Sequence, residues 1–130
     1  MLSQFKGETG FPQLIWYGQE GNFSVAAMTM LGPSLQQLFE FCQYKFSVKT
    51  VCLLGMQMID RFSKVHEKLF VHRDVKPENI CVGQGKKDKT VFLIDFGLSK
   101  RYISPLTSQH IEHKKGRGTV GTIRYLSHWA

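Results

Sequence analysis

The run His72-Arg73-Asp74-Val75-Lys76-Pro77-Glu78-Asn79, followed downstream by Asp95-Phe96-Gly97, is the part of this sequence that decides the fold. It carries carboxylates and an amide at fixed spacing. A carboxylate such as Asp74 can orient an incoming hydroxyl group. An amide oxygen and a second carboxylate, here Asn79 and Asp95, are the kind of oxygen ligands that Mg²⁺ prefers. False positives are rare for a motif of this length.

The whole chain has 130 residues, enough for one small domain, and its 42% hydrophobic and 21% charged content is ordinary for a globular protein. Cys42, Cys52 and Cys81 lack metal-ligand spacing and have apolar neighbours, which predicts buried thiols in a reducing compartment. No segment approaches ~18 uninterrupted apolar residues, and the N-terminus has no signal-peptide pattern. We expect an intracellular protein, in the cytoplasm, the nucleus or both, without a membrane span.

The formal net charge is +7, and basic residues concentrate at positions 86–89 and 100–117. Such charge attracts acidic partners, whether phosphopeptides, acidic proteins or nucleic acid. For the first cluster, a solvated turn is an equally good interpretation. Tyr102 is the one aromatic residue in the second cluster, so stacking support for nucleic acid is weak. We therefore expect protein partners and not nucleic acid.

The first half of the chain predicts a hairpin and two helices. Residues 14–17 and 23–30 have the composition of strands, and the turn between them contains glycine and asparagine. Ser34 and Gln37 have the spacing of a capping box for a short helix. The longest helix is expected from Ser47 to about Glu67. Its apolar residues recur at three- and four-residue spacing and predict a core-facing stripe, made of Val51, Leu54, Met58, Phe62 and Val65.

The second half of the chain predicts short strands around loops. Residues 69–72 and 80–82 should flank the motif as strands, and residues 91–94 form an apolar strand that leads to Asp95. Residues 99–118 are polar and lack periodicity, which predicts a long functional loop.

Three further runs occur around the motif: Leu31-Gly32-Pro33-Ser34-Leu35, Asp95-Phe96-Gly97-Leu98-Ser99-Lys100-Arg101-Tyr102 and Gly121-Thr122-Ile123-Arg124-Tyr125. Together with residues 72–79, they resemble the casein kinase 1 family of serine/threonine protein kinases. The resemblance extends from about Phe11 to Ser127. Lys76 and Pro77 follow the serine/threonine pattern, whereas tyrosine kinases usually carry alanine and arginine in that stretch.

This resemblance implies an α+β, protein-kinase-like fold, present as a fragment. Residues 1–30 would be the end of the N-lobe and the hinge. Residues 31–130 would run from the start of the C-lobe, with its long helix and catalytic loop, through the activation segment. Upstream of the first strand the chain has neither a glycine-rich phosphate loop nor a Val-Ala-x-Lys motif, both of which kinases use to hold ATP.

The same resemblance implies the catalytic roles and the cofactors ATP and Mg²⁺. Asp74 would orient a serine or threonine hydroxyl and accept its proton. Lys76 would neutralise charge on the transferring phosphoryl group. Asn79 and Asp95 would bind Mg²⁺.

The nucleotide pocket and an anion site are implied in the same way. Met28 would guard the back of the adenine pocket, and the hinge from Thr29 to Leu31 would pair with adenine. Cys81 and Ile94 would form apolar walls. Gln37 stands where the family often has an aspartate that faces the ribose. The resemblance also implies a basic site that accepts acidic or already phosphorylated substrates, made of Arg73, Lys100, Arg117 and, in a neighbouring position, Arg124.

Several alternatives stay open from the sequence. A solvated loop position is an alternative for Arg117. The chain could be a catalytically dead, pseudokinase-like binding or scaffolding module, which the missing phosphate loop favours and the intact Asp74, Asn79 and Asp95 disfavour. A nucleic-acid binder that uses the basic loop is a third, weaker hypothesis.

Overall fold

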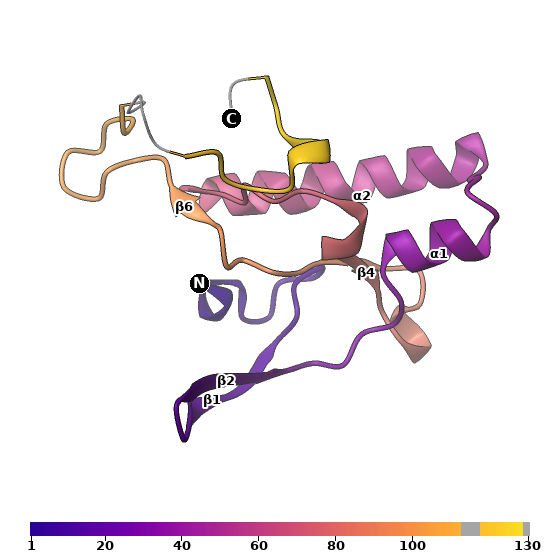
Figure 1. Ribbon diagram of the computed structural model, residues 1–130, viewed down its shortest axis with the longest axis horizontal. Helices are drawn as coiled ribbons and strands as arrows, with labels where there is room; N and C mark the ends of the chain where they lie inside the picture. The colour runs from indigo at the N-terminus through magenta and orange to yellow at the C-terminus, as the bar shows by residue number, and fades with distance from the viewer. Residues whose placement is uncertain (113–117, 129–130) are drawn as a thin grey trace.

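The computed structural model describes residues 1–112 and 118–128. It combines two α-helices with three small antiparallel sheets of two strands each. In Figure 1 the helices α1 and α2 lie on one side of strand β4, and the β1–β2 hairpin lies on the other side. The mixed content and this order of elements confirm the α+β fragment expected from the sequence.

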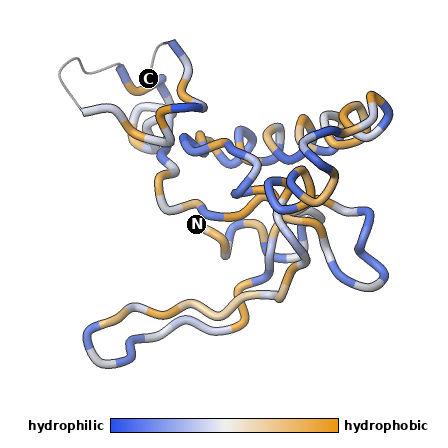
Figure 2. Tube along the Cα trace, turned by 45° about the vertical axis from the view of Figure 1, so that its right-hand side comes forward, coloured by the Kyte–Doolittle hydropathy of each residue, from blue (hydrophilic) through white to orange (hydrophobic). Residues whose placement is uncertain are grey.

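The hairpin is formed by β1 (Leu14–Glu20) and β2 (Phe23–Met28). Gly21 occupies the turn with a φ of 58°, a conformation that costs glycine little. The first strand runs three residues further than expected, and the second ends two residues earlier. Figure 2 shows the hairpin extending away from the rest of the chain. As a result its apolar side chains are solvent-exposed, including Ile15 at 71% and Phe23 at 75%.

Both predicted helices are present and capped as expected. Helix α1 (Leu35–Phe41) begins at Ser34 with a complete capping box, in which the Gln37 side chain accepts a hydrogen bond from the Ser34 amide. Helix α2 (Val48–Glu67) begins at Ser47, whose hydroxyl accepts from the Thr50 amide. These side chains satisfy N–H groups that have no partner within the helix.

The predicted core stripe of α2 is correct except at its first residue. Val65 is fully buried, and Leu54, Met58 and Phe62 pack against the core. Val51, however, is 55% exposed. It lies in the second turn of the helix, and the strands that α2 contacts, β5 and β3, do not cover it. The periodicity predicted the apolar stripe correctly. It could not predict which residues of the stripe other elements bury.

The remaining strands are short and pair at the motif. Strand β4 (Ile80–Val82) pairs with β5 (Val91–Leu93), so the two strands that flank Asn79 and Asp95 lie side by side. Strand β3 (Phe70–Val71) pairs with β6 (Lys100–Arg101). The sequence predicted residues 99–118 as irregular, so β6 corrects that prediction. Pairing with β3 orders these two residues although their own sequence has no strand pattern.

The N-terminal segment forms much of the core. A 3₁₀ turn (Leu2–Phe5) delivers Phe5, which stacks on Phe11 with ring centroids 4.2 Å apart. Both rings are buried and share a cluster with Val65 and Leu93. Nothing in the sequence pattern indicated that this segment is central.

The cysteine prediction holds for one residue of three. Cys81 on β4 is buried, and burial raises the pKa of its thiol. Cys42 and Cys52 are exposed, contrary to expectation, because they lie at the end of α1 and on the uncovered side of α2.

Within residues 1–112 and 118–128, no helix has the length and apolar character that a membrane span requires.

Candidate active site

The loop between β3 and β4 is anchored by His72. Its Nε2 lies 2.9 Å from the Ile94 carbonyl oxygen, and its Nδ1 accepts from the Asp74 amide at 3.3 Å. These partners require a neutral ring with the proton on Nε2. Burial lowers the pKa of His72, which favours that neutral form, although the bond to Ile94 opposes the shift. His72 therefore ties the loop to the residue that precedes Asp95.

The Asp74 carboxylate is the centre of the polar contacts in the site. Its Oδ1 accepts from the Thr122 amide at 3.0 Å and from the Thr122 hydroxyl at 2.6 Å. Its Oδ2 is 2.8 Å from the Lys76 ammonium and accepts from the Asn79 amide group at 3.1 Å. Lys76 also donates to the Thr122 hydroxyl at 2.9 Å. Three residues thus converge on one buried carboxylate.

These contacts shift the protonation of both partners in the ion pair. The hydrogen bonds from Lys76 and then from Thr122 lower the pKa of Asp74 to about 2, against a smaller opposing effect of burial. The bond to Asp74 raises the pKa of Lys76. Both groups therefore stay charged throughout the physiological range.

Asp95 begins the turn that follows β5, and the residue before it is bonded through its amide to the Asn79 carbonyl. The φ of Asp95 is 59°, and its Oδ1 accepts from the Gly97 amide at 3.1 Å. The next residue, Phe96, packs its ring against His72 at 5.1 Å and Phe5 at 5.4 Å. This stack fixes the chain where Asp95 leaves the strand.

The segment that follows the predicted hinge runs alongside β4. The Gly32 amide donates to the Val82 carbonyl, and Ser34 forms a bridge with Cys81. Leu31, in the predicted hinge, therefore lies next to the end of that strand, whereas Thr29 lies next to Gln13. The Thr29 amide is already bonded to Gln13, and the Leu31 carbonyl accepts from the Gln84 side chain.

The structure also shows the surroundings of Ile94, Met28 and Gln37. Ile94 is joined to Asn79 by its backbone amide, which keeps it beside β4. Met28 ends β2 and is 41% exposed. Gln37 caps α1, which explains how the helix start accommodates glutamine where the resembled family often has aspartate.

Two of the four predicted anion-site residues lie on adjacent segments. Arg73 follows β3 with a φ of 70° and donates from Nε to the Leu98 carbonyl at 2.6 Å. Lys100 on β6 pairs with Val71 and is exposed. Arg124 lies in a separate 3₁₀ turn (Ile123–Tyr125), and Arg117 falls outside the described residues.

Thr122 is the principal site residue that the sequence reasoning did not select. It lies far from Asp74 in the chain, and its signal was its place in the Gly-Thr-Ile-Arg-Tyr run. Gly121 before it has a φ of 113°, and a Cβ there would lie 2.6 Å from the Arg73 carbonyl oxygen. Glycine is therefore required for this close approach.

A run with the spacing Gly-x-Gly-x-x-Gly occurs at residues 116–121. It follows Asp95 in the chain and does not join two strands ahead of the hinge. Its last glycine contacts the catalytic loop. Its place in the chain therefore differs from that of a kinase phosphate loop, which precedes the hinge.

Comparison with known families agrees with this geometry. The family model described as protein kinase domain matches residues 14–127. That match covers most of the chain, and the chain belongs to the protein kinase domain family. Its class is therefore that of a kinase, a transferase of phosphoryl groups.

Proposed function

We propose that the chain is the part of a casein kinase 1-type serine/threonine kinase that holds the catalytic loop. The observation that carries this proposal is the Asp74 carboxylate, bound at once by Lys76, Asn79 and Thr122. Phosphoryl transfer depends mainly on positioning and on charge stabilisation, and this network supplies both. The lysine at position 76 and the short motifs at residues 31–35 and 121–125 favour the serine/threonine class and the casein kinase 1 type.

In the proposed reaction, a serine or threonine hydroxyl oxygen bonds to the γ-phosphorus of ATP. The bond from that phosphorus to the β–γ bridging oxygen breaks, and ADP leaves with its electron pair. Asp74 orients the hydroxyl and receives its proton. Because the pKa of Asp74 is about 2, the proton moves late, after the new bond has acidified the hydroxyl. Lys76 stabilises the charge on the phosphoryl oxygens.

The residues present fit a Mg²⁺ ion that binds together with the nucleotide. Asn79 uses its amide hydrogens on Asp74, which leaves its oxygen as a ligand, and Asp95 offers a carboxylate. Among the described residues, no group of three or more His, Cys, Asp or Glu side chains could hold a metal alone. Mg²⁺ commonly binds through one or two protein oxygens and the phosphates. When bound, it would neutralise charge on the ATP phosphates.

Adenine is proposed to pair with the hinge. Among the hydrogen bonds of the described residues, the Thr29 amide and the Leu31 carbonyl are in use. The Thr29 carbonyl and the Leu31 amide then offer one acceptor and one donor. Met28 would guard the back of this pocket, and the apolar walls would come from Cys81 and Ile94.

The proposed preference for acidic or phosphorylated substrates rests on charge. Arg73 and Lys100 lie on adjacent segments, and within residues 1–112 and 118–128 the hydrogen bonds of the Arg73 side chain come from its Nε, to Leu98. Its terminal nitrogens can therefore form charge-assisted bonds to an oxyanion. Arg124 and Arg117 would add further positive charge on the substrate side.

Transfer of labelled phosphate from ATP to casein tests the proposal. We expect transfer by a protein that joins this chain to a glycine-rich loop and its lysine, and there Asp95→Asn and Asp74→Asn should each lower the rate by about 100-fold or more. Asp88→Asn is the matched control, because Asp88 lies in an exposed turn remote from the motif and should leave the rate unchanged.

A catalytically dead binding or scaffolding module is the second candidate, and residues 1–13 contain neither a glycine-rich phosphate loop nor a Val-Ala-x-Lys motif. It predicts that the chain binds nucleotide and Mg²⁺ without transferring phosphate. Absence of both transfer and Mg²⁺-dependent nucleotide binding would contradict the two candidates together.

A further inference from the structure

Strand β5 pairs with β4 along one edge. Along its other edge, the outer edge, side chains form the hydrogen bonds that a further strand would otherwise form. The backbone groups of Thr90, Phe92 and Ile94 face β4, where the Ile94 amide donates to the Asn79 carbonyl. The groups of Lys89, Val91 and Leu93 face the opposite way. An open strand edge in a protein interior leaves these groups without partners unless another element supplies them.

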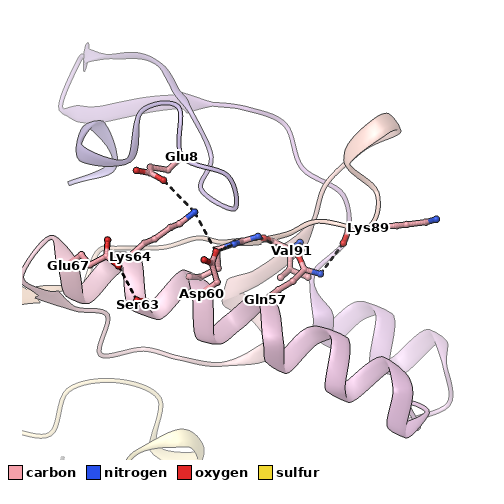
Figure 3. A network of polar contacts seen from close by, with 9 residues as sticks. Glu8, Gln57, Asp60, Ser63, Lys64, Glu67, Lys89 and Val91 are labelled. Atoms are coloured by element: carbon pink, nitrogen blue, oxygen red, sulfur yellow. Dashed lines mark hydrogen bonds and ion pairs between the residues drawn. The ribbon is translucent and has the colours of Figure 1, made fainter.

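Two residues of α2 fill that role in place of a third strand. The Gln57 amide donates to the Lys89 carbonyl at 3.1 Å and accepts from the Val91 amide at 3.0 Å. Arg61 donates from Nε to the Val91 carbonyl at 3.2 Å. Figure 3 shows Gln57 reaching from the helix to Lys89 and Val91. Together these two side chains form what we call the β5 clamp.

The N-terminal segment packs against the clamp at Gly10. Gly10 accepts from the Leu93 amide at 2.9 Å, which completes the outer edge. A Cβ at Gly10 would overlap the Arg61 side chain, which is itself 5% exposed. Lys64, one turn further along α2, forms an ion pair with Glu8 at 3.5 Å (Figure 3).

The clamp acts on a strand that ends at the site. Only Ile94 separates β5 from Asp95, and Ile94 is bonded on one side to Asn79 and on the other to His72. A shift of β5 along its axis would therefore reach both proposed Mg²⁺ ligands. Val91 and Leu93 are buried, so losing one clamp bond leaves a buried polar group unpaired.

We infer that Gln57 and Arg61 are positioning residues that hold Asp95 and Asn79 in the geometry needed to bind a divalent cation. They contact neither the cation nor the substrate and act through strand β5. The inference rests on the proposed function, because it concerns the same metal ligands.

Gln57→Met tests the inference. It keeps the length of the side chain and removes the two hydrogen bonds that Gln57 makes to Lys89 and Val91. Gln36→Met is the matched control, because in the described part of the chain the Gln36 amide bonds to Glu40 on the exposed face of α1 and to no strand. Two quantities are measured on the folded chain: Mn²⁺ affinity in the presence of ATP, by electron paramagnetic resonance, and hydrogen exchange of the Ile94 amide. We expect Gln57→Met to weaken Mn²⁺ binding by about tenfold and to speed exchange at Ile94 by about tenfold.

A second pair of variants covers the case in which Gln57→Met does not fold. Arg61→Lys keeps a donor that can reach the Val91 carbonyl and should retain more Mn²⁺ affinity than Arg61→Met. Equal loss in both Arg61 variants, or unchanged exchange at Ile94 in Gln57→Met while Val91 exchanges faster, would overturn the inference. If the unsubstituted chain binds no Mn²⁺, the proposed function fails, and exchange at Ile94 alone decides the role of the clamp.

Discussion

At the scale of single residues, the chemistry of the site depends on how Asp74 is surrounded. A carboxylate that accepts several hydrogen bonds and an ion pair is a weak base and a good orienting group. The sequence predicted Asp74, Lys76 and Asn79 because they share one short run. Thr122 was not predicted as a site residue, since its contact with Asp74 depends on the path of the whole loop between them.

Thr122→Val should raise the pKa of Asp74 from about 2 toward its ordinary value of 3.8. The valine keeps the shape of the side chain and the backbone amide bond but removes the hydroxyl that donates to Asp74. Carboxyl carbon chemical shifts, followed by NMR as the pH is lowered, measure this pKa. Thr122→Ser keeps the hydroxyl and should titrate like the unsubstituted chain. An identical titration in Thr122→Val would contradict the contact.

The low pKa of Asp74 also predicts how stability depends on pH. Its folded-state pKa, about 2, is below the unfolded value of 3.8, so its contribution is fully present above about pH 4. That contribution is lost as the pH falls through about 2. Urea unfolding of the chain and of Asp74→Asn, compared between pH 5 and pH 2, should give free energies that converge at the acid end. A constant difference over that range would rule the ion pair out as its source.

At the scale of elements, local signals predicted the helices well and the tertiary contacts poorly. The helix starts at Ser34 and Ser47 are set by caps that lie within four residues, so the sequence alone reveals them. Strand β6 and the buried N-terminal segment have no such local signal. They form because a partner strand or a core cavity accepts them, which depends on residues far away in the chain.

The docking of the N-terminal segment gives an element-scale prediction. Gly10 and Gly7 both have positive φ, of 87° and 81°, but only at Gly10 would a Cβ meet another side chain. Gly7→Ala should therefore cost about 1 kcal/mol from backbone strain alone. Gly10→Ala must also displace the Arg61 side chain and should cost about 3 kcal/mol or more. Chemical denaturation measures both, and equal losses would mean that the segment does not pack against Arg61.

At the scale of the whole molecule, the sequence predicted the class of fold and the order of its elements, because the motif fixes the kinase family. It did not predict which apolar faces are covered. The periodicity of α2 marks its apolar residues, but burial depends on the neighbours that each face meets. Val65 meets the N-terminal segment and β5, whereas Val51 meets water.

The uncovered faces predict self-association of this chain. On α2, Val48 is 80% exposed, Met56 69% and Ile59 73%, and they follow one side of the helix. Soluble monomers rarely expose contiguous apolar patches larger than a few hundred Å². Burying such a patch against a second copy removes apolar area from water and stabilises the pair by roughly 25 cal/mol per Å² before association costs.

Sedimentation velocity over a range of protein concentrations measures this association. We expect the weight-average sedimentation coefficient to rise with concentration, because two exposed apolar faces gain more from contact with each other than from contact with water. Met56→Lys with Ile59→Glu places charges on the same face and should weaken association by about tenfold or more, since a charge loses hydration on burial. Lys86→Gln removes a charge in the exposed turn between β4 and β5, which is not part of this helix face, and should leave association unchanged. A chain that stays monomeric at every concentration, with a cooperative unfolding transition at high temperature, would mean that these side chains do not mediate self-association. In that case the exposed face of α2 would be a stable part of the folded molecule.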